Sequence, residues 1–393
     1  MRKINTMNSK AGTPVEGDDF FGREKELAYA WKRIKSGNNL IFPSPRRVGK
    51  TSFALKLVEI AKAEDWQVIS INLEKITSEK AFIESFIEEL KKSSIWETVK
   101  EKGSKLFDFI KQIKPTYEHE DFKFSLEWQS QKEDIYKQLA DLLNHEKETL
   151  IFMDELTVLL SDMINQEDGH RNVSTFLHWM RELRIKSGSK IRWIFCSSVG
   201  IENFTHTHRI SATMNDMSDY FLKPFDNETS KAMLRKLAER DSLDLSIEIQ
   251  EAIVQKLSFC LPYFLQLMFE KISYLFEVEE LTLNAEIVEI AYKALINEKH
   301  FNTWVERIQE QYGNLSNQAF ALLKHICQEN QGSKRENLIN VLSGQNQNIE
   351  ETESAVAHLL YMLKNDGYLM EENNLYLFRS PLLRDFWFNR FTK

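Results

Sequence analysis

The sequence predicts an α/β protein in which a parallel sheet of five strands forms the core of the first half and helices dominate the second. Of its 393 residues, 42% are hydrophobic and 28% charged, as in globular proteins, and the small numbers of glycine (13) and proline (7) favour helices. Short apolar runs alternate with helical patterns as far as Pro224, which is the order that a parallel sheet requires. Past Pro224 the strand pattern fades.

The strands are expected where short apolar runs end in turn residues or acids. They are predicted at 39–42, 67–73, 149–153, 191–195 and 220–222. Apolar residues at helical spacing predict connecting helices at 49–61, 79–113, 131–144 and 175–185. Residues 122–128 alternate strictly between apolar and polar side chains, which predicts a further strand in a helical and hairpin insertion at about 95–130.

The second half is expected to contain a helical lid and then a winged-helix domain. Helical patterns for the lid lie at 228–240, 247–257, 262–276 and 284–297. Further helices are predicted at 302–312, 316–329, 333–342, 349–364 and 381–391, with a β-hairpin turned by Asn373-Asn374 before the last of them. Three helices followed by a hairpin are the pattern of a winged helix.

Composition argues against several classes of protein. The cysteines, Cys196, Cys260 and Cys327, are far apart and lack C-x-x-C spacing, so neither a disulfide framework nor a zinc site is expected. The sequence has no apolar h-region at its N-terminus and no run of about 18 apolar residues, so we expect a cytoplasmic protein that does not span a membrane. The formal net charge of -8 argues against a protein whose main task is to hold nucleic acid.

The clearest chemical signal lies between the strand at 39–42 and the helix that follows it. The loop reads Ser-Pro-Arg-Arg-Val-Gly-Lys-Thr-Ser, a Walker A pattern with Ser44 in place of its first glycine. Backbone N–H groups and the helix N-terminus would cradle phosphates, Lys50 would bridge the β- and γ-phosphates, and Thr51 would bind Mg²⁺. The predicted nucleotide-binding residues are Ser44, Pro45, Arg46, Arg47, Val48, Gly49, Lys50, Thr51 and Ser52. Because serine lacks the freedom of glycine at positive φ, we expect slow hydrolysis.

Two acids follow the apolar run at 149–153, as in a Walker B strand. Parallel strands deliver their carboxyl ends to one edge of the sheet, where ligands bind in open α/β folds. Asp154 would hold Mg²⁺, directly or through water, and Glu155 would orient and polarise the attacking water. The two motifs together predict an Mg²⁺-dependent ATPase that binds ATP and ADP.

The strand at 191–195 is followed by two serines that are sensor candidates. In P-loop ATPases with such a strand, it lies between the strands of the two Walker motifs, so a polar side chain at its end can contact the γ-phosphate or the lytic water. Ser198 is the first choice for this role and Ser197 the second. The alternative is that serine only caps the turn at Gly200.

Segments spread over the chain from about residue 18 to its end carry a family resemblance. They are FGREKEL at 21–27, PRRVGKTS at 45–52, FMDE at 152–155, SVG at 198–200, Asn215-Asp216, Pro262-Tyr263 and FRSPLL at 378–383. Together they resemble the archaeal-type ATPases of the STAND class, relatives of the origin-recognition AAA+ ATPases. The resemblance implies that Phe21, Gly22 and Arg23 lie near the adenine and ribose, and that Pro262 meets the nucleotide.

The same resemblance implies a nucleotide-dependent switch with an ATPase core, a lid and a winged helix. The predicted division is a flexible tail at 1–17, a P-loop ATPase domain at 18–225, a lid at 226–298 and a winged helix at 299–393. Such switches use an arginine on the γ-phosphate. Of the candidates Arg181, Arg184 and Arg209, we choose Arg184.

The acidic helix at 349–365 separates the functional hypotheses. It carries Glu350, Glu351, Glu353 and a single lysine, Lys364, which suits protein contacts better than phosphates. We therefore expect a switch that controls its own assembly or a separately encoded effector, in signalling or defence. The alternative is an origin-recognition-like ATPase that binds DNA, with Lys334, Arg335 and Arg379 as contacts. A third reading is a nucleotide-binding scaffold without hydrolysis.

Overall fold

The computed structural model describes residues 7–43, 46–93, 121–143, 147–197, 200–343 and 349–392, and the side chains of 121–131 are outside this description. The chain divides into two compact units, each described here by itself. The sheet unit consists of Arg23–Pro43 and Phe53–Phe221. The helical unit consists of the N-terminal segment up to Gly22, the Walker A loop up to Ser52, and the chain from Leu222 onward.

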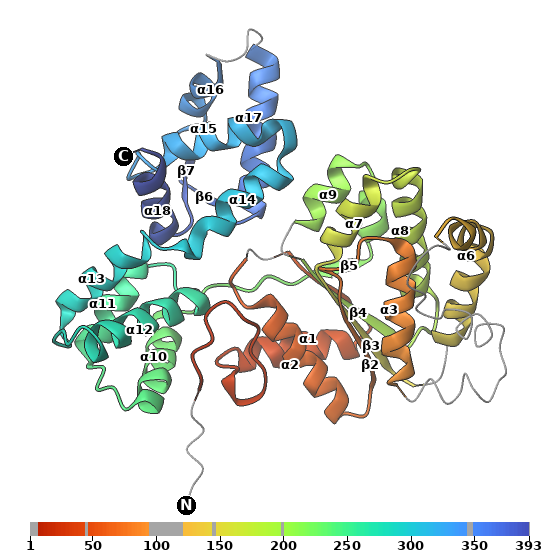
Figure 1. Cartoon of the computed structure of the whole chain (residues 1–393), viewed down its shortest axis with the longest axis horizontal. Helices are drawn as coiled ribbons and strands as arrows, with labels where there is room; N and C mark the ends of the chain where they lie inside the picture. The colour runs from red at the N-terminus through yellow and green to blue at the C-terminus, as the bar shows by residue number, and fades with distance from the viewer. Residues whose placement is uncertain are drawn as a thin grey trace, which may run out of the picture. The chain divides into compact units, whose positions relative to one another are not determined.

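The sheet unit contains a parallel sheet of five strands in the order β2-β3-β4-β1-β5 (Figure 1). The strands are β1 (Asn39–Phe42), β2 (Gln67–Asn72), β3 (Thr149–Asp154), β4 (Ile191–Cys196) and β5 (Met217–Asp219). This confirms the predicted α/β class, and β4 lies between β1 and β3 as expected. The fifth strand was predicted at 220–222, and this placement was wrong, because the strand ends at Asp219. The N–H of Tyr220 still donates to the carbonyl of Ile41 at 2.9 Å, and its ring is buried against Phe42 and Phe53.

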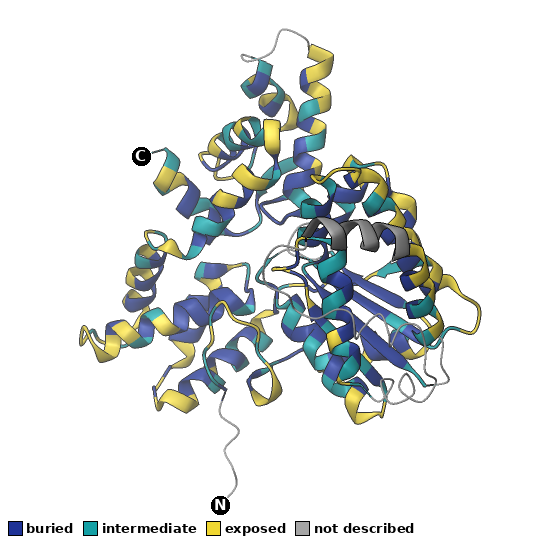
Figure 2. Ribbon diagram, turned by 45° about the vertical axis from the view of Figure 1, so that its right-hand side comes forward, coloured by how far each residue is buried: buried dark blue, intermediate teal, exposed yellow. Residues whose placement is uncertain are grey.

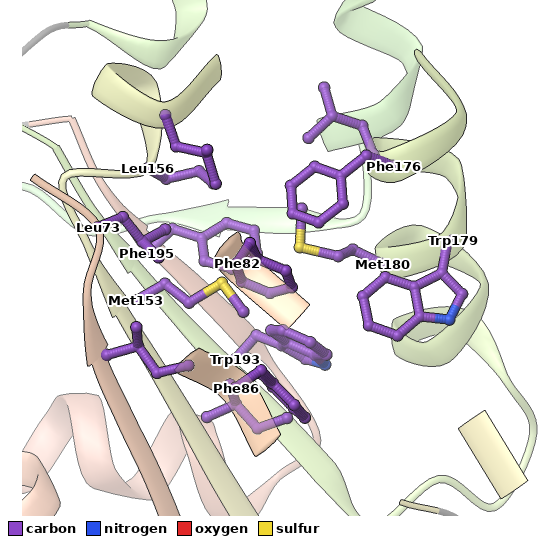
Figure 3. Packing of buried hydrophobic residues seen from close by; sticks show 14 of the residues in the cluster. Leu73, Phe82, Phe86, Met153, Leu156, Phe176, Trp179, Met180, Trp193 and Phe195 are labelled. Atoms are coloured by element: carbon purple, nitrogen blue, oxygen red, sulfur yellow. The ribbon is translucent and has the colours of Figure 1, made fainter. Parts of the chain in front are cut away.

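Helices cover both faces of this sheet (Figure 1). They are α1 (Glu24–Lys35), α2 (Lys50–Ala63), α3 (Glu79–Lys91), α6 (Asp121–Leu143), α7 (Leu156–Ile164), α8 (Gly169–Ile185) and α9 (Ile201–Thr207). Successive strand residues point to opposite faces, so a strand buried on both faces reads as a continuous apolar run. Met153 and Trp193 belong to the core cluster with α3, α7 and α8 (Figure 3), while Phe42 packs on Phe53 of α2 on the other face. The burial colours of Figure 2 show the strands dark blue between these helices.

The predicted strand at 122–128 is wrong, because these residues lie in α6. Seven alternating residues are a weak signal beside the longer helical pattern that follows them, and a helix is extended more readily than it is nucleated. Tertiary contacts hold the helix: the Tyr136 ring stacks on Trp179 at 4.6 Å, and Lys132 Nζ lies 2.6 Å from a carboxylate oxygen of Glu79. The rest of the predicted insertion, up to residue 120, lies outside the described residues.

From Leu222 onward, the helical unit starts with four helices, which lie where the lid was predicted. They are α10 (Asn227–Asp241), α11 (Ile247–Leu257), α12 (Pro262–Glu277) and α13 (Ala285–Leu295). Their starts follow local capping rules. The carboxylate of Asp226 accepts the N–H of Thr229 at 2.7 Å, and Pro262 occupies the first turn of α12, where a missing N–H costs nothing.

The end of the chain contains helices and a hairpin. The elements are α14 (Asn302–Gln311), α15 (Ser316–Ile326), α16 (Arg335–Ser343), α17 (Ile349–Asn365), β6 (Leu369–Glu372), β7 (Leu375–Phe378) and α18 (Pro381–Phe391). Asn373 and Asn374 both have positive φ, 52° and 62°, which matches the tight turn that asparagine favours between twisted strands. No helix in the described part of the chain is both long and apolar enough to cross a membrane.

Candidate functional site

The two Walker motifs start from the same edge of the sheet. Both β1 and β3 pair with β4, and the register places Phe42 beside Cys196 and Met153 beside Phe195. Neighbouring strands lie about 4.8 Å apart, so the ends of β1 and β3 are separated by about 10 Å. The loop after β1 and the acids after β3 therefore both start from one carboxyl edge of the sheet.

Asp154 and Glu155 form the turn at the end of β3. Asp154 is the last residue of the strand and is buried, and its Oδ1 accepts the N–H of Glu155 at 3.1 Å. Glu155 has a left-handed backbone, with φ 57°. A residue other than glycine pays about 1–2 kcal/mol for this conformation. Strain of this kind is concentrated at functional sites, where it aims a side chain that a relaxed turn would direct elsewhere.

The Walker A loop belongs to the helical unit and leads into α2 at Lys50. Two of its residues have positive φ, Arg47 at 67° and Gly49 at 92°. A Cβ on Gly49 would meet nothing within 4 Å, so the glycine is needed for its backbone conformation and not for space. The N-terminus of α2 presents N–H groups to an anion, which is the arrangement that phosphate sites use. Ser44 and Pro45 lie outside the described residues.

The segment predicted to contact adenine packs against the start of α10. Gly22 has φ 61°, and a Cβ there would lie 3.1 Å from Thr229 Cγ2. The ring of Phe21 meets that of Phe225 edge-on at 6.4 Å. The N–H of Phe225 donates to the carbonyl of Cys260, two residues before Pro262, at 2.9 Å. Within the helical unit, Phe225 thus links the Phe21-Gly22 pair to the segment that contains the predicted lid proline.

Arg23 follows Gly22 in the chain but belongs to the sheet unit. Its backbone is left-handed, with φ 92°, and its guanidinium is buried 3.4 Å from the carboxylate of Glu26. Burial lowers the pKa of Arg23, and the charge of Glu26 opposes that shift. The hydroxyl of Tyr220 donates a hydrogen bond to the carbonyl of Glu26 at 2.6 Å. Arg23 is therefore held tightly by the start of α1.

Arg184, which was predicted to act on the γ-phosphate, is bound to Asp216 and Thr213 in the structure. Its side chain is 0% exposed, and its Nε and Nη2 atoms donate to the carboxylate of Asp216 at 2.5 and 3.1 Å. Nη2 also donates to the carbonyl of Thr213 at 2.6 Å. An arginine that acts on a phosphate needs a guanidinium that can reach it. In this structure Arg184 instead fastens α8 to the segment before β5, while Arg209 is exposed and Ser198 lies outside the described residues.

Replacing Asp216 with asparagine is expected to destabilise the protein by about 2 kcal/mol, because the buried guanidinium keeps a hydrogen-bond acceptor but loses its counter-charge. Chemical denaturation would measure the loss, and Glu182→Gln, an exposed acid on α8, is the control that should leave stability unchanged. A stability equal to wild type in Asp216→Asn would contradict the structural role of the pair.

Among the residues near the C-terminus, the charge pattern favours protein contacts over DNA contacts. Glu350, Glu351 and Glu353 are exposed on α17, and Lys364 pairs with Glu371 at 2.6 Å. Arg379 is partly buried, and its guanidinium donates to the carbonyl of Lys364 at 3.1 Å. Burial also lowers its pKa. Lys334 and Arg335 are exposed, as a DNA contact would require.

Three residues that contact the predicted motifs were not found from the sequence. Asp216 was noted only as part of a family segment, yet it holds Arg184. Tyr263, which also appeared only in a family segment, and Gly12 both contact Arg47 of the Walker A loop. Their partners are distant in the chain, and a single sequence carries no signal for such pairs. Among the described residues, no group of three or more His, Cys, Asp or Glu side chains could hold a metal ion.

The strand order, the loop that joins β1 to α2 and the acids that end β3 define a P-loop NTPase fold. Residues 40–207 match the model of the family described as ATPase family associated with various cellular activities (AAA). The match covers both Walker motifs and supports nucleotide binding by this part of the chain. No curated protein is significantly similar to the sequence.

Solved structures extend the likeness of fold over nearly the whole chain. A Walker-type ATPase of Pyrococcus abyssi superposes with a TM-score of 0.62 at 18% identity, over 95% of this chain and 97% of that one. The ORC2 protein of Aeropyrum pernix, in its ADPNP-ADP complexes, superposes with a TM-score of 0.57 at 14% identity, over 99% of this chain and 97% of that one. At such identities the likeness concerns the fold alone.

Proposed function

We propose that this protein is an Mg²⁺-dependent ATPase that works as a regulatory switch, in which the nucleotide state controls assembly with itself or with a partner protein. In this proposal Lys50 binds the β- and γ-phosphates, Thr51 and Asp154 hold Mg²⁺, and Glu155 polarises the attacking water. The single observation that carries the proposal is the common sheet edge from which the loop after β1 and the acids after β3 both start.

The remaining roles follow from the segments around this edge. Phe21, Gly22 and Arg23 would contact the adenosine, and Pro262 would approach the nucleotide from the lid. Support comes from the packing of the Phe21-Gly22 pair on α10 and from the bond between Phe225 and Cys260. Ser198 would sense the γ-phosphate. Because Arg184 is committed to Asp216, we place the arginine that completes the site on a neighbouring molecule or on a partner.

The charge pattern favours a protein over DNA as the partner of the switch. The helix that would enter a major groove, α17 in the proposed winged helix, exposes three glutamates and no unpaired lysine in its described part. Affinity for DNA comes from phosphates that Lys and Arg neutralise, and a net charge of -8 opposes it. The resemblance to origin-recognition ATPases keeps DNA binding as the alternative.

The assembly state is expected to change with the nucleotide. Light scattering on the full chain should give a different mass with a non-hydrolysable ATP analogue than with ADP, because only the triphosphate provides a γ-phosphate for an arginine in trans. The Lys50→Ala variant should not respond to either nucleotide. A mass that is the same in both states, together with nucleotide-dependent capture of duplex DNA and a steep loss of that binding with salt, would support the DNA-binding alternative instead.

A further inference from the structure

Residues 8–15, which we call the strap, are folded back beside the Walker A loop inside the helical unit. From the sequence we expect a flexible tail at 1–17, and in the structure residues of this segment make several hydrogen bonds. Asp19 holds the beginning of the strap, since its carboxylate accepts the N–H of Asn8 at 2.7 Å and lies 2.6 Å from Lys10 Nζ. These bonds close the chain into a loop, and the preceding Met7 is buried.

The strap is bonded to the Walker A loop at two points. The guanidinium of Arg47 donates to the carbonyl of Gly12 at 3.3 Å, and the N–H of Val15 donates to the hydroxyl of Ser52 at 3.0 Å. Both bonds use side chains of the loop, so the contact itself requires none of the loop's backbone amides. A phosphate could therefore be cradled by those amides while the strap remains bound.

The strap is also bonded to one face of α12. The N–H of Lys10 donates to Gln266 Oε1 at 2.7 Å, and the hydroxyl of Ser9 donates to Glu270 Oε1 at 2.6 Å. Gln266 and Glu270 are four residues apart and so lie on one face of the helix. Gln266 is only 6% exposed, which makes its bond to the strap costly to lose.

Arg47 is the residue where loop, strap and helix meet. Its guanidinium lies 4.2 Å from the ring centre of Tyr263, one turn before Gln266 on α12. Its backbone is left-handed, a conformation that is unfavourable for a side chain other than glycine. The contacts with Gly12 and Tyr263 offset that unfavourable term, because a charged hydrogen bond and a cation–π contact both stabilise this conformation.

We propose that the strap positions the Walker A loop for nucleotide and couples it to α12, with Arg47 and Gln266 as positioning residues. The inference rests on the proposed nucleotide site. The strap holds the loop in its left-handed shape before the phosphates arrive, so less order has to be created on binding. This coupling is reciprocal. If the docked strap raises the affinity for nucleotide by some factor, bound nucleotide favours the docked state of the strap by the same factor.

The test compares two substitutions of Gln266. Gln266→Leu keeps the size of the side chain but removes the acceptor for the Lys10 N–H, and Gln266→Glu keeps an acceptor. We expect the dissociation constant for ADP to rise about three- to tenfold in Gln266→Leu, the equivalent of one hydrogen bond, and to return towards the wild-type value in Gln266→Glu. Hydrogen exchange of residues 7–16 should be faster in Gln266→Leu. In the wild type, ADP should slow it.

A second variant keeps α12 intact. Lys10→Pro removes the N–H that donates to Gln266, and it leaves the packing of α12 unchanged. It also removes the ion pair between Lys10 and Asp19, so Lys10→Ala, which loses only that ion pair, is the control. Lys10→Pro should weaken ADP binding by a factor similar to that of Gln266→Leu. Faster exchange of the strap with unchanged ADP affinity in both variants would overturn the coupling while nucleotide binding stands. A wild type that binds no ADP would overturn the proposed function itself, and the coupling with it.

Discussion

The substitution Lys50→Ala is expected to weaken ATP and ADP binding by about 30-fold to several thousand-fold, which corresponds to a loss of about 2–5 kcal/mol. Lys50 is the first residue of α2 and is largely buried, so its ammonium group would meet the phosphates in a place shielded from water. Removing a charge that pairs with a poorly solvated phosphate leaves that phosphate without compensation. Fluorescence titration with a labelled nucleotide would measure the loss.

Lys56→Ala is the matched control for this substitution. Lys56 lies on the same helix and pairs with Glu59 at 2.5 Å, so its removal tests the effect of losing a lysine from α2 without touching the loop. We expect Lys56→Ala to bind nucleotide like the wild type. Equal affinity in Lys50→Ala and the wild type would exclude the Walker A role and, with it, the proposed switch.

The second large effect is expected from Glu155→Gln, which should slow ATP hydrolysis by about 100- to 10,000-fold and leave ATP binding unchanged. The amide has nearly the same shape as the carboxylate but cannot accept the proton of the attacking water. The left-handed backbone at this position aims the side chain, and glutamine keeps that geometry. Single-turnover measurement of phosphate release would separate chemistry from binding.

Glu148→Gln provides the control for the loss of one carboxylate. Glu148 lies just before the opposite end of β3, so the same chemical change is made away from the carboxyl edge. Its hydrolysis rate should equal that of the wild type. If Glu155→Gln hydrolysed ATP as fast as the wild type, the polarising group would have to be another residue. If neither the wild type nor the variant hydrolysed ATP, the protein would be a nucleotide-binding scaffold.

Much of the local structure could be predicted because its signals lie within a few neighbouring residues. The apolar runs at 39–42 and 149–153 are strands because they are short and buried on both faces. Asn373 and Asn374 specify the hairpin turn through their tolerance of positive φ. The alternation at 122–128 failed as a signal, since a helix can present the same few residues when the rest of its length is packed against a core.

The sequence alone determined the class of fold and four of the five strands of its sheet, because periodicity and turn chemistry act over a few residues. Only the tertiary structure decided which side chains are engaged. Arg184 meets a carboxylate 32 residues away, and the strap bonds to a glutamine 256 residues away. Such pairs form because folding brings distant segments into contact, where a buried charge or N–H group must find a partner.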